Sequence, residues 1–167
     1  MAELLKPLAN ITLRAAHPSE ARTIASMSRL HVEYGLNWRW TPAKVRHHIK
    51  DKDTMVLIAN RDGVIAGFAI MRFGDDLAHL FLLAVKPEYR RTGIGQSMME
   101  WLEKSCRTAG IQQVRLEVRA SNRGAMEFYR NLGYRFVGKV AGYYDRCESA
   151  AIMARSMNEP APRKSSN

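Results

Sequence analysis

The sequence lacks several features that would assign it quickly to a class of proteins. It has no hydrophobic run of about 18 residues, the length that a membrane-spanning helix needs. Its only cysteines are Cys106 and Cys147, with no zinc-ligand spacing around them, and such thiols are typical of a reducing compartment. The first residues, MAELLKPLANITLR, lack an apolar core behind a basic start. We therefore expect a cytoplasmic protein with no secretory signal, no membrane partner and no metal.

What the sequence does contain is an excess of positive charge. It carries 26 lysines and arginines against 16 acidic residues, a formal net charge of +10. Such a balance favours anionic partners, which include nucleic acid, the ribosome, a membrane surface and a polyphosphate cofactor. The basic residues are scattered, with no run of five or six, so no nucleic-acid-binding motif accompanies the charge. We therefore expect no nucleic-acid partner.

The spacing of apolar residues predicts helices that interleave with strands. Strands are expected over residues 11–16, 54–60, 63–73, 77–85, 113–120, 134–140 and 149–157. Helices are expected between residues 17 and 35, and over 42–50, 94–109 and 123–131. One hairpin interrupts the alternation, so the sheet should be mixed and the fold α/β. Residues 158–167 have lost all periodicity and are predicted to form a disordered tail.

The segment RRTGIG, residues 90–95, lies between an expected strand and an expected helix. The first N–H groups of a helix have no partner within it, and together with the helix dipole they favour a bound anion. Glycine lets the backbone approach such a ligand closely. The same residues also fit an ordinary left-handed turn with solvated arginines. The patterns of a P-loop and of a dinucleotide fingerprint are both absent.

A second motif follows about 25 residues later. It is LEVRASNRGAMEFYRNLGYRFVG, residues 116–138, a strand followed by an asparagine-capped helix. Together, R-x-x-G-x-G at 90–95 and N-x-x-A-x-x-F-Y-x-x-x-G-Y at 122–134 resemble the two acetyl-CoA motifs of the GNAT N-acetyltransferase superfamily. Within it, LEVRASN, FYRNLGY and the late YY and AAIM segments most resemble the bacterial ribosomal-protein-alanine N-acetyltransferases.

The resemblance implies a fold, an acetyl donor and a set of residues that bind it. The fold would be a single domain over residues 1–157, with a twisted, mostly antiparallel sheet of about 6–7 strands and about four helices. The donor would be acetyl-CoA, its pantetheine arm pairing with the strand and its pyrophosphate lying in the turn. The residues implied to bind it are Leu83, Ala84, Val85, Arg90, Arg91, Thr92, Gly93, Ile94, Gly95, Gln96, Asn122 and Tyr129.

The resemblance also implies catalytic residues for transfer of acetyl to a primary amine. Tyr129 would protonate the departing thiolate, because a tyrosine with a pKa of about 10 keeps its proton at neutral pH. An ammonium must first lose a proton to a base, and Glu117 lies where the ribosomal-type enzymes place theirs. Glu117 is equally compatible with a salt bridge to a neighbouring arginine. His79, six residues before Val85, is a rival base or simply a core histidine.

The acceptor is less well indicated than the donor. Tyr143 and Tyr144 fit either the acceptor entrance or the packing of the last hairpin, and residues 38–40 (WRW) fit an acceptor wall or the core. The segment between Tyr144 and Ile152 is shorter than expected for a ribosomal-type enzyme. A protein or peptide α-amine is the expected acceptor. A small-molecule amine or antibiotic stays open, as does a non-catalytic module that senses acyl-CoA or docks on RNA. A homodimer also stays open.

Overall fold

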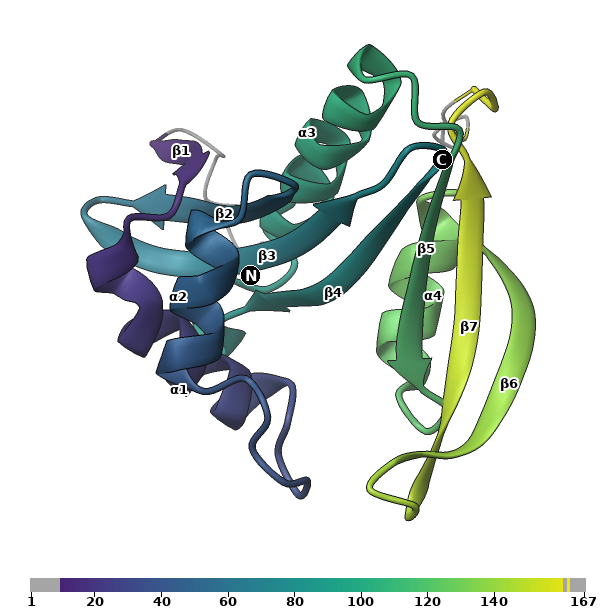
Figure 1. Cartoon of the computed structure of the whole chain (residues 1–167), viewed down its shortest axis with the longest axis horizontal. Coiled ribbons are helices and arrows are strands. Elements are labelled where there is room, and N and C mark those ends of the chain that lie inside the picture. Colours follow the sequence, from purple (N-terminus) through teal and green to yellow (C-terminus); the bar gives the residue numbers. More distant parts are fainter. Residues whose placement is uncertain (1–9, 161, 163–167) are drawn as a thin grey trace, which may run out of the picture. The chain divides into compact units, whose positions relative to one another are not determined.

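The computed structural model describes residues 10–160 and residue 162 (Figure 1). In these residues the elements are β1 (Ile11–Ala15), α1 (Ala21–His31), α2 (Pro42–Lys50), β2 (Thr54–Arg61), β3 (Val64–Phe73), β4 (Leu77–Val85), α3 (Ile94–Thr108), β5 (Gln113–Arg119), α4 (Arg123–Asn131), β6 (Arg135–Tyr144) and β7 (Glu148–Ser156). Their order along the chain is the predicted one, with 3-10 helices added at Pro18–Glu20 and Pro87–Tyr89.

Hydrogen bonding places the seven strands in the order β1-β2-β3-β4-β5-β7-β6. The β4–β5 pair is parallel whereas β1–β2, β2–β3, β5–β7 and β6–β7 are antiparallel, so the sheet is mixed and the α/β class is confirmed. Most of the predicted tail, residues 161 and 163–167, lies outside the described residues. No helix in the described part of the chain is long and apolar enough to cross a membrane.

The chain divides into two compact units. The first unit comprises the residues up to Arg72 together with Phe81–Leu102, and the second comprises Phe73–Leu80 together with the residues from Glu103 onward. Strand β4 and helix α3 therefore each contribute residues to both units.

In the first unit, β2 and β3 form a hairpin whose turn residues explain its geometry. Asp62 and Gly63 have φ angles of 51° and 81°, and a tight hairpin turn with the right twist needs left-handed residues there. Leu57 lies opposite Ala69 in the antiparallel register, and β1 pairs with β2 on the other side. These strands provide the sheet surface on which α1 and α2 lie (Figure 1).

The two helices of the first unit bury one face each against this sheet. Thr41 caps α2 by accepting a hydrogen bond from the Lys44 N–H at 3.3 Å, as the Thr-Pro start predicts. Residues of α1, α2, β2, β3 and β4 share one core: Ala21, Ile24, Ala25, Met27, Val45, Val56, Ile58, Phe68, Ile70, Leu82 and Ala84. Leu30 continues the apolar spacing of α1 yet is 67% exposed. It lies about 180° around the helix from Ala21, so it faces away from the core.

In the second unit, the first half of β4 runs parallel to β5, with Leu77 opposite Gln113 and Leu80 opposite Leu116. Strand β7 lies between β5 and β6 and is antiparallel to both. Figure 1 shows α4 beside β5 and the long β6–β7 hairpin. Strand β6 continues to Tyr144, further than predicted, because irregularities in its register let it keep pairing with β7. Residues 145–147 alone connect the two strands.

Candidate functional site

The turn between β4 and α3 lies in the first unit and includes the first sequence motif. Arg91 and Gly93 have φ angles of 58° and 85°, so the chain takes two left-handed steps just before the helix. The Arg90 Nε donates a hydrogen bond to the Val85 carbonyl at 3.1 Å, and the Thr92 hydroxyl donates to the Tyr89 carbonyl. Both hydrogen bonds come from side chains of the turn, and they hold the turn against the end of β4.

This turn has the features of an anion site. The Ser97 N–H donates to the Gly93 carbonyl at 3.0 Å, which is the start of the helical hydrogen-bond ladder. The N–H groups that precede Ser97 in the first turn lie ahead of that ladder, at the positive end of the dipole. The Arg91 side chain is exposed beside them. The residues present therefore fit a diphosphate. The φ angles of Arg91 and Gly93 also agree with the alternative interpretation, a left-handed turn with solvated arginines.

A glycine that sequence reasoning missed lets β3 approach β4 closely. A Cβ added at Gly67 would lie 2.8 Å from the Ala84 carbonyl oxygen and 3.1 Å from the Met98 Cε. Backbone cannot move aside as a flexible side chain can, so any side chain at this position displaces the end of β4. No local pattern indicates this role, because one glycine inside an apolar strand is ordinary.

In the second unit, the two rival bases are partners. His79 Nε2 and Glu117 Oε2 make a short hydrogen bond between the neighbouring strands β4 and β5. The side chain of Glu117 is 13% exposed and that of His79 is 34% exposed, so the pair is sheltered on the carboxylate side and open to solvent on the imidazole side. A carboxylate that binds one ring nitrogen fixes the orientation of the imidazole. Such a pair can accept a proton from outside.

Two tyrosines lie in the same unit as this pair. Burial raises the pKa of Tyr129 well above its ordinary value, and Tyr144 contributes to the rise. Burial first, then Tyr143 and Glu117, raise the pKa of Tyr144 in the same direction. The Tyr129 ring packs edge-on against Tyr134, with ring centroids 5.7 Å apart. Both hydroxyls therefore keep their protons at neutral pH, as a proton donor must.

The remaining polar residues near α4 serve the structure. Asn122 caps α4, its side-chain oxygen accepting a hydrogen bond from the Ala125 N–H at 3.0 Å. Arg119 forms an ion pair with Glu148 at 3.6 Å, and Ser121 donates a short hydrogen bond to the same carboxylate. Arg119 is thus engaged with Glu148 while Glu117 is engaged with His79. The proposed role of Asn122 in holding the donor stays a prediction.

An aromatic cluster lies in the first unit between the loop after α1, helix α2 and strand β4. The Trp40 ring centroid is 5.0 Å from that of His48 and 5.7 Å from that of Phe81. Trp38 and Trp40 are both partly buried against the core, so packing accounts for one side of each ring. Each also carries a cation on its ring, Arg29 on Trp38 and Lys44 on Trp40. The positions of Trp38 and Trp40 are compatible both with core packing and with a wall of the acceptor site.

The cysteines do not have the features of a nucleophile. Cys106 is fully buried, and burial raises the pKa of its thiol to about 11. A thiol with that pKa holds almost no thiolate at neutral pH. Cys147 is exposed, in the connection between β6 and β7. Within the described residues no group of three or more metal-ligating side chains is present.

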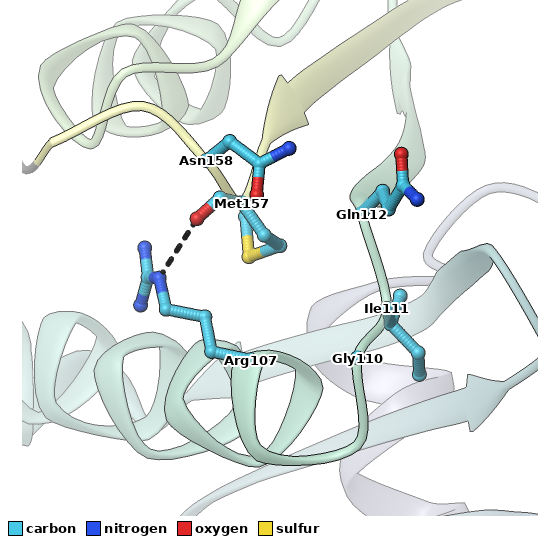
Figure 2. Close-up of a pocket in the computed structure, with 6 residues that line it drawn as sticks. All are labelled: Arg107, Gly110, Ile111, Gln112, Met157 and Asn158. Carbon is cyan, nitrogen blue, oxygen red and sulfur yellow. Dashed lines mark hydrogen bonds between the residues drawn. The ribbon is translucent and has the colours of Figure 1, made fainter.

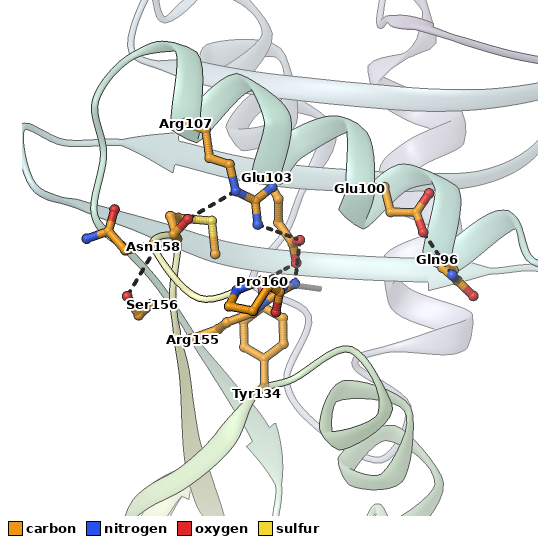
Figure 3. A network of polar contacts seen from close by, with 10 residues as sticks. Gln96, Glu100, Glu103, Arg107, Tyr134, Arg155, Ser156, Asn158 and Pro160 are labelled. Atoms are coloured by element: carbon orange, nitrogen blue, oxygen red, sulfur yellow. Dashed lines mark hydrogen bonds and ion pairs between the residues drawn. The ribbon is translucent and has the colours of Figure 1, made fainter. Parts of the chain in front are cut away.

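A second carboxylate cluster in the second unit was missed entirely. Figure 3 shows Glu103 of α3 between Tyr134, which donates to it at 3.0 Å, and Arg155 of β7, which donates at 2.7 Å. The Glu103 and Arg155 side chains are each 4% exposed. Burial raises the pKa of Glu103, while Arg155 opposes the rise. The signal that could have found it is helical spacing, because Met99 and Cys106, at i−4 and i+3 from Glu103, are apolar and fully buried.

A hollow in the second unit lies beyond the end of α3, next to the end of β7 (Figure 2). Its lining residues are Arg107, Gly110, Ile111, Gln112, Met157 and Asn158. The Arg107 Nε donates to the Met157 carbonyl at 3.1 Å, so the arginine helps to hold this corner together. None of the residues that the sequence motifs single out lines the hollow.

Known proteins resemble this chain in sequence and in fold. The ribosomal protein bS18-alanine N-acetyltransferase of Escherichia coli is 39% identical over 97 residues, which cover 56% of this chain and 66% of that protein. An N-alpha-acetyltransferase of Saccharolobus solfataricus is 27% identical over 161 residues, covering 89% of this chain and 94% of the relative. The matched part thus spans just under two thirds of the Escherichia coli relative.

A solved structure extends the likeness to the fold. The crystal structure of the Escherichia coli ribosomal-protein-alanine N-acetyltransferase superposes with a TM-score of 0.78 at 25% identity, covering 92% of this chain and 98% of that one. The model of the acetyltransferase (GNAT) family matches residues 22–134, which is more than half of the chain. The resemblance inferred from the two motifs is therefore confirmed, and the chain belongs to the acetyltransferase (GNAT) family.

Proposed function

We propose that this protein transfers the acetyl group of acetyl-CoA to a primary amine, the α-amine of a protein or peptide. The observation that carries the proposal is the His79–Glu117 hydrogen bond, a proton-accepting pair, in a chain of the acetyltransferase family. The Escherichia coli and Saccharolobus solfataricus relatives, named as acetyltransferases of alanine or α-amino groups, support this acceptor class.

The donor is proposed to bind through the first motif. Main-chain N–H groups at the start of α3, with Arg91 beside them, suit the diphosphate of coenzyme A. Leu83 and Val85 lie on β4 beyond Leu80, where the parallel register with β5 ends. Main-chain groups on such a stretch suit the amides of the pantetheine arm, which add to a strand as another strand does. Asn122 is proposed to contact the donor through its amide nitrogen, since its oxygen caps α4.

The proton transfers are assigned to the second unit. An amine is an ammonium at neutral pH, so one proton must leave before its nitrogen can bond to the acetyl carbon. We assign that proton to the His79–Glu117 pair, acting as one base rather than as two alternatives. When the carbon–sulfur bond breaks, the sulfur takes a proton from the Tyr129 hydroxyl. The nitrogen, now bonded to the acetyl carbon, loses its second proton, which restores that hydroxyl. The raised pKa of Tyr129 means that this hydroxyl carries its proton before the reaction.

The proposal is tested by the release of free coenzyme A from acetyl-CoA when the protein is given peptides with a free α-amine. We expect release with peptides, and a decrease in kcat of about 10²-fold in Tyr129→Phe. Tyr143→Phe is the matched control, since Tyr143 is 44% exposed. If coenzyme A were released only with aminoglycosides or other small amines, the acceptor would be a small molecule and not a peptide. If no amine led to release of coenzyme A, a sensing or docking module would be favoured.

Two further assignments belong to this proposal. A cytoplasmic location accords with free thiols at Cys106 and Cys147. One domain over residues 1–157 is proposed as the catalytic unit, although the chain forms two compact units within it. A homodimer stays a prediction, which a measurement of the protein's oligomeric state would test.

A further inference from the structure

Helices α1 and α2 and the loop between them, all in the first unit, form a strongly basic surface. Residues 21–50 contain six lysines and arginines against a single acidic residue, Glu33, so this segment carries +5 of the chain's net charge of +10. The six are Arg22, Arg29, Arg39, Lys44, Arg46 and Lys50, and all of their side chains are exposed. We call the surface that these six residues form the basic surface.

The packing of the two helices directs this charge outward from one side of their sheet. Both helices bury their apolar residues in one core against β2, β3 and β4, so their polar sides face away from those strands. Arg22 and Arg29 are seven residues apart in α1 and lie on the same side of it, about 10 Å apart. Arg46 and Lys50 are one turn apart in α2 and also share a side. The expectation of no nucleic-acid partner rested on scattered basic residues, so it is reopened.

The one carboxylate in the segment does not offset that charge at the surface. Glu33 is 7% exposed. One oxygen accepts from the N–H groups of Arg39 and Trp40 at 2.7 and 3.2 Å, and the other accepts from the Ser28 hydroxyl at 2.9 Å. Glu33 is thus used to fold the loop between α1 and α2.

Carboxylates at the two ends of the segment are engaged as well. Glu20, before α1, pairs with Arg14 at 2.8 Å, and Asp51, after α2, accepts from the Thr54 hydroxyl at 2.9 Å. Among the ion pairs between described residues, none includes a cation of α1 or α2. The positive field of the two helices is therefore available to an external anion.

Aromatic rings alternate with these cations. The stretch YGLNWRW, which begins at Tyr34, holds three rings around one arginine, and Tyr34 is 56% exposed. The Arg29 guanidinium carbon lies 5.1 Å from the Trp38 ring centroid. The Lys44 Nζ lies 4.2 Å from the centroid of Trp40. Proteins that bind single-stranded nucleic acid combine cations that follow the phosphates with rings on which bases stack.

The two features together favour RNA over other polyanions. A membrane surface needs a helix with an apolar face directed outward, and in α1 and α2 Leu30 is the one large apolar side chain that is exposed. An acidic protein matches the cations but supplies no unpaired bases. Single-stranded RNA offers a row of phosphates for the cations and bases for the rings.

We infer that the first unit docks on single-stranded RNA through the basic surface, with phosphates on the cations of α1 and α2 and an unpaired base on the Tyr34 ring. Docking is a further function and does not depend on acetyl transfer, in which the six basic residues have no assigned part. Contacts with phosphates carry no sequence information, so binding is independent of base sequence and weakens as salt is added.

The test measures binding of the full chain to a labelled oligouridylate of about 20 nucleotides by fluorescence anisotropy, without acetyl-CoA. We expect a Kd on the order of 10⁻⁶ M at about 50 mM salt. The logarithm of the association constant should fall with the logarithm of the salt concentration with a slope of about −3, which corresponds to about four phosphate contacts. Absence of binding at this salt concentration overturns the inference.

Charge reversal locates the docking surface. Arg22→Glu combined with Arg46→Glu should weaken RNA binding by about tenfold or more and make the salt slope shallower by about 1.4, because two phosphate contacts are lost. Arg130→Glu combined with Lys139→Glu is the matched control, since it changes the net charge equally at exposed side chains of the second unit. We expect the control to weaken binding by less than about threefold. Equal losses in both double variants overturn the assignment to the basic surface.

Removal of the exposed ring tests the second feature. Tyr34→Ala should weaken binding by about fivefold or more and leave the salt slope unchanged, because a stacked base is lost and no phosphate contact is. An unchanged Kd in this variant overturns the stacking. An oligoglutamate of the same charge that binds as tightly as the RNA overturns the RNA partner in favour of an acidic protein, and equal binding to anionic phosphatidylserine vesicles does so in favour of a membrane.

The same preparations keep docking separate from acetyl transfer. Arg22→Glu combined with Arg46→Glu should release coenzyme A with a short peptide within about twofold of the original protein, because short peptides do not use the docking surface. RNA binding without release of coenzyme A from any amine would overturn the proposed function and leave docking standing. Release of coenzyme A without RNA binding would do the reverse.

Discussion

Two glutamates of the second unit, Glu103 and Glu117, each meet a basic side chain, and their surroundings differ in how far they are closed to solvent. Glu103 on α3 is bound by Arg155 and Tyr134, and both charged side chains are 4% exposed. Glu117 on β5 is bound by His79, whose side chain is 34% exposed. The Glu103 carboxylate is enclosed by its hydrogen-bond donors, whereas Glu117 is bound by a histidine that reaches solvent.

The difference separates a structural role from a chemical one. A buried carboxylate needs all of its partners, because removal of one leaves a charge without compensation in a medium of low polarity. A histidine at a surface can gain and lose a proton at physiological pH. The Glu103 cluster therefore contributes to stability, and the His79–Glu117 pair is suited to proton transfer. Two predictions test this contrast, and a third concerns a histidine outside both pairs.

The largest effect is expected when the closed cluster is broken. Arg155→Ala removes the cation that donates to Glu103 at 2.7 Å and leaves the buried carboxylate with only the longer Arg107 contact at 3.9 Å. We expect the free energy of unfolding to fall by about 3–5 kcal/mol. Urea denaturation followed by circular dichroism measures it. Arg135→Ala is the control: Arg135 pairs with Glu159 at 3.8 Å, and its side chain is 76% exposed. That surface pair should contribute less than about 1 kcal/mol, and equal losses in both variants would refute the contrast.

A smaller change, in activity rather than stability, is expected at the His79–Glu117 pair, which is open to solvent. Glu117→Gln keeps a hydrogen-bonding group beside His79 but removes the charge, and we expect kcat/KM for a peptide to fall by about 10²-fold. The free energy of unfolding should change by less than about 1 kcal/mol, since the pair is partly exposed. Steady-state kinetics and urea denaturation of the same preparation measure both.

The control for that variant is Glu148→Gln, which alters another carboxylate of the second unit. Glu148 pairs with Arg119 and Ser121 and has no assigned part in proton transfer. We expect its kcat/KM to stay within about threefold of the original protein. If Glu148→Gln lost as much activity as Glu117→Gln, the His79–Glu117 pair would have no particular role in proton transfer.

The smallest effect is expected from a histidine outside both pairs. Burial first, then His47 and Lys44, lower the pKa of His48 in the folded protein, and the neighbouring Asp51 only partly opposes them. The unfolded chain therefore binds a proton at this position more readily, so stability decreases as pH falls through the unfolded pKa of about 6.5. His48→Gln should flatten the dependence of the unfolding free energy on pH between about 7 and 5. An unchanged slope would contradict it.

Most of the elements could be predicted because their signals are local. Thr41 and Pro42 start α2, and Asp62 with Gly63 turns the β2–β3 hairpin, as the sequence indicates. Leu30 continues the apolar spacing of α1 and is nevertheless exposed, because apolar spacing alone does not say which face of a helix meets the core. The extra length of β6 depends on pairing with β7, a partner that no local pattern reveals.

The sequence by itself determined the order of the elements, the family and the left-handed turn before α3, because caps, turns and glycine positions act over a few residues. The tertiary structure alone decided that His79 and Glu117, 38 residues apart in the chain, are one pair. It alone also enclosed Glu103 and fixed Lys44 and Arg29 on their tryptophan rings. Strand pairing and helix packing bring distant residues together, so contacts of this kind are set by the folded chain and not by its local pattern.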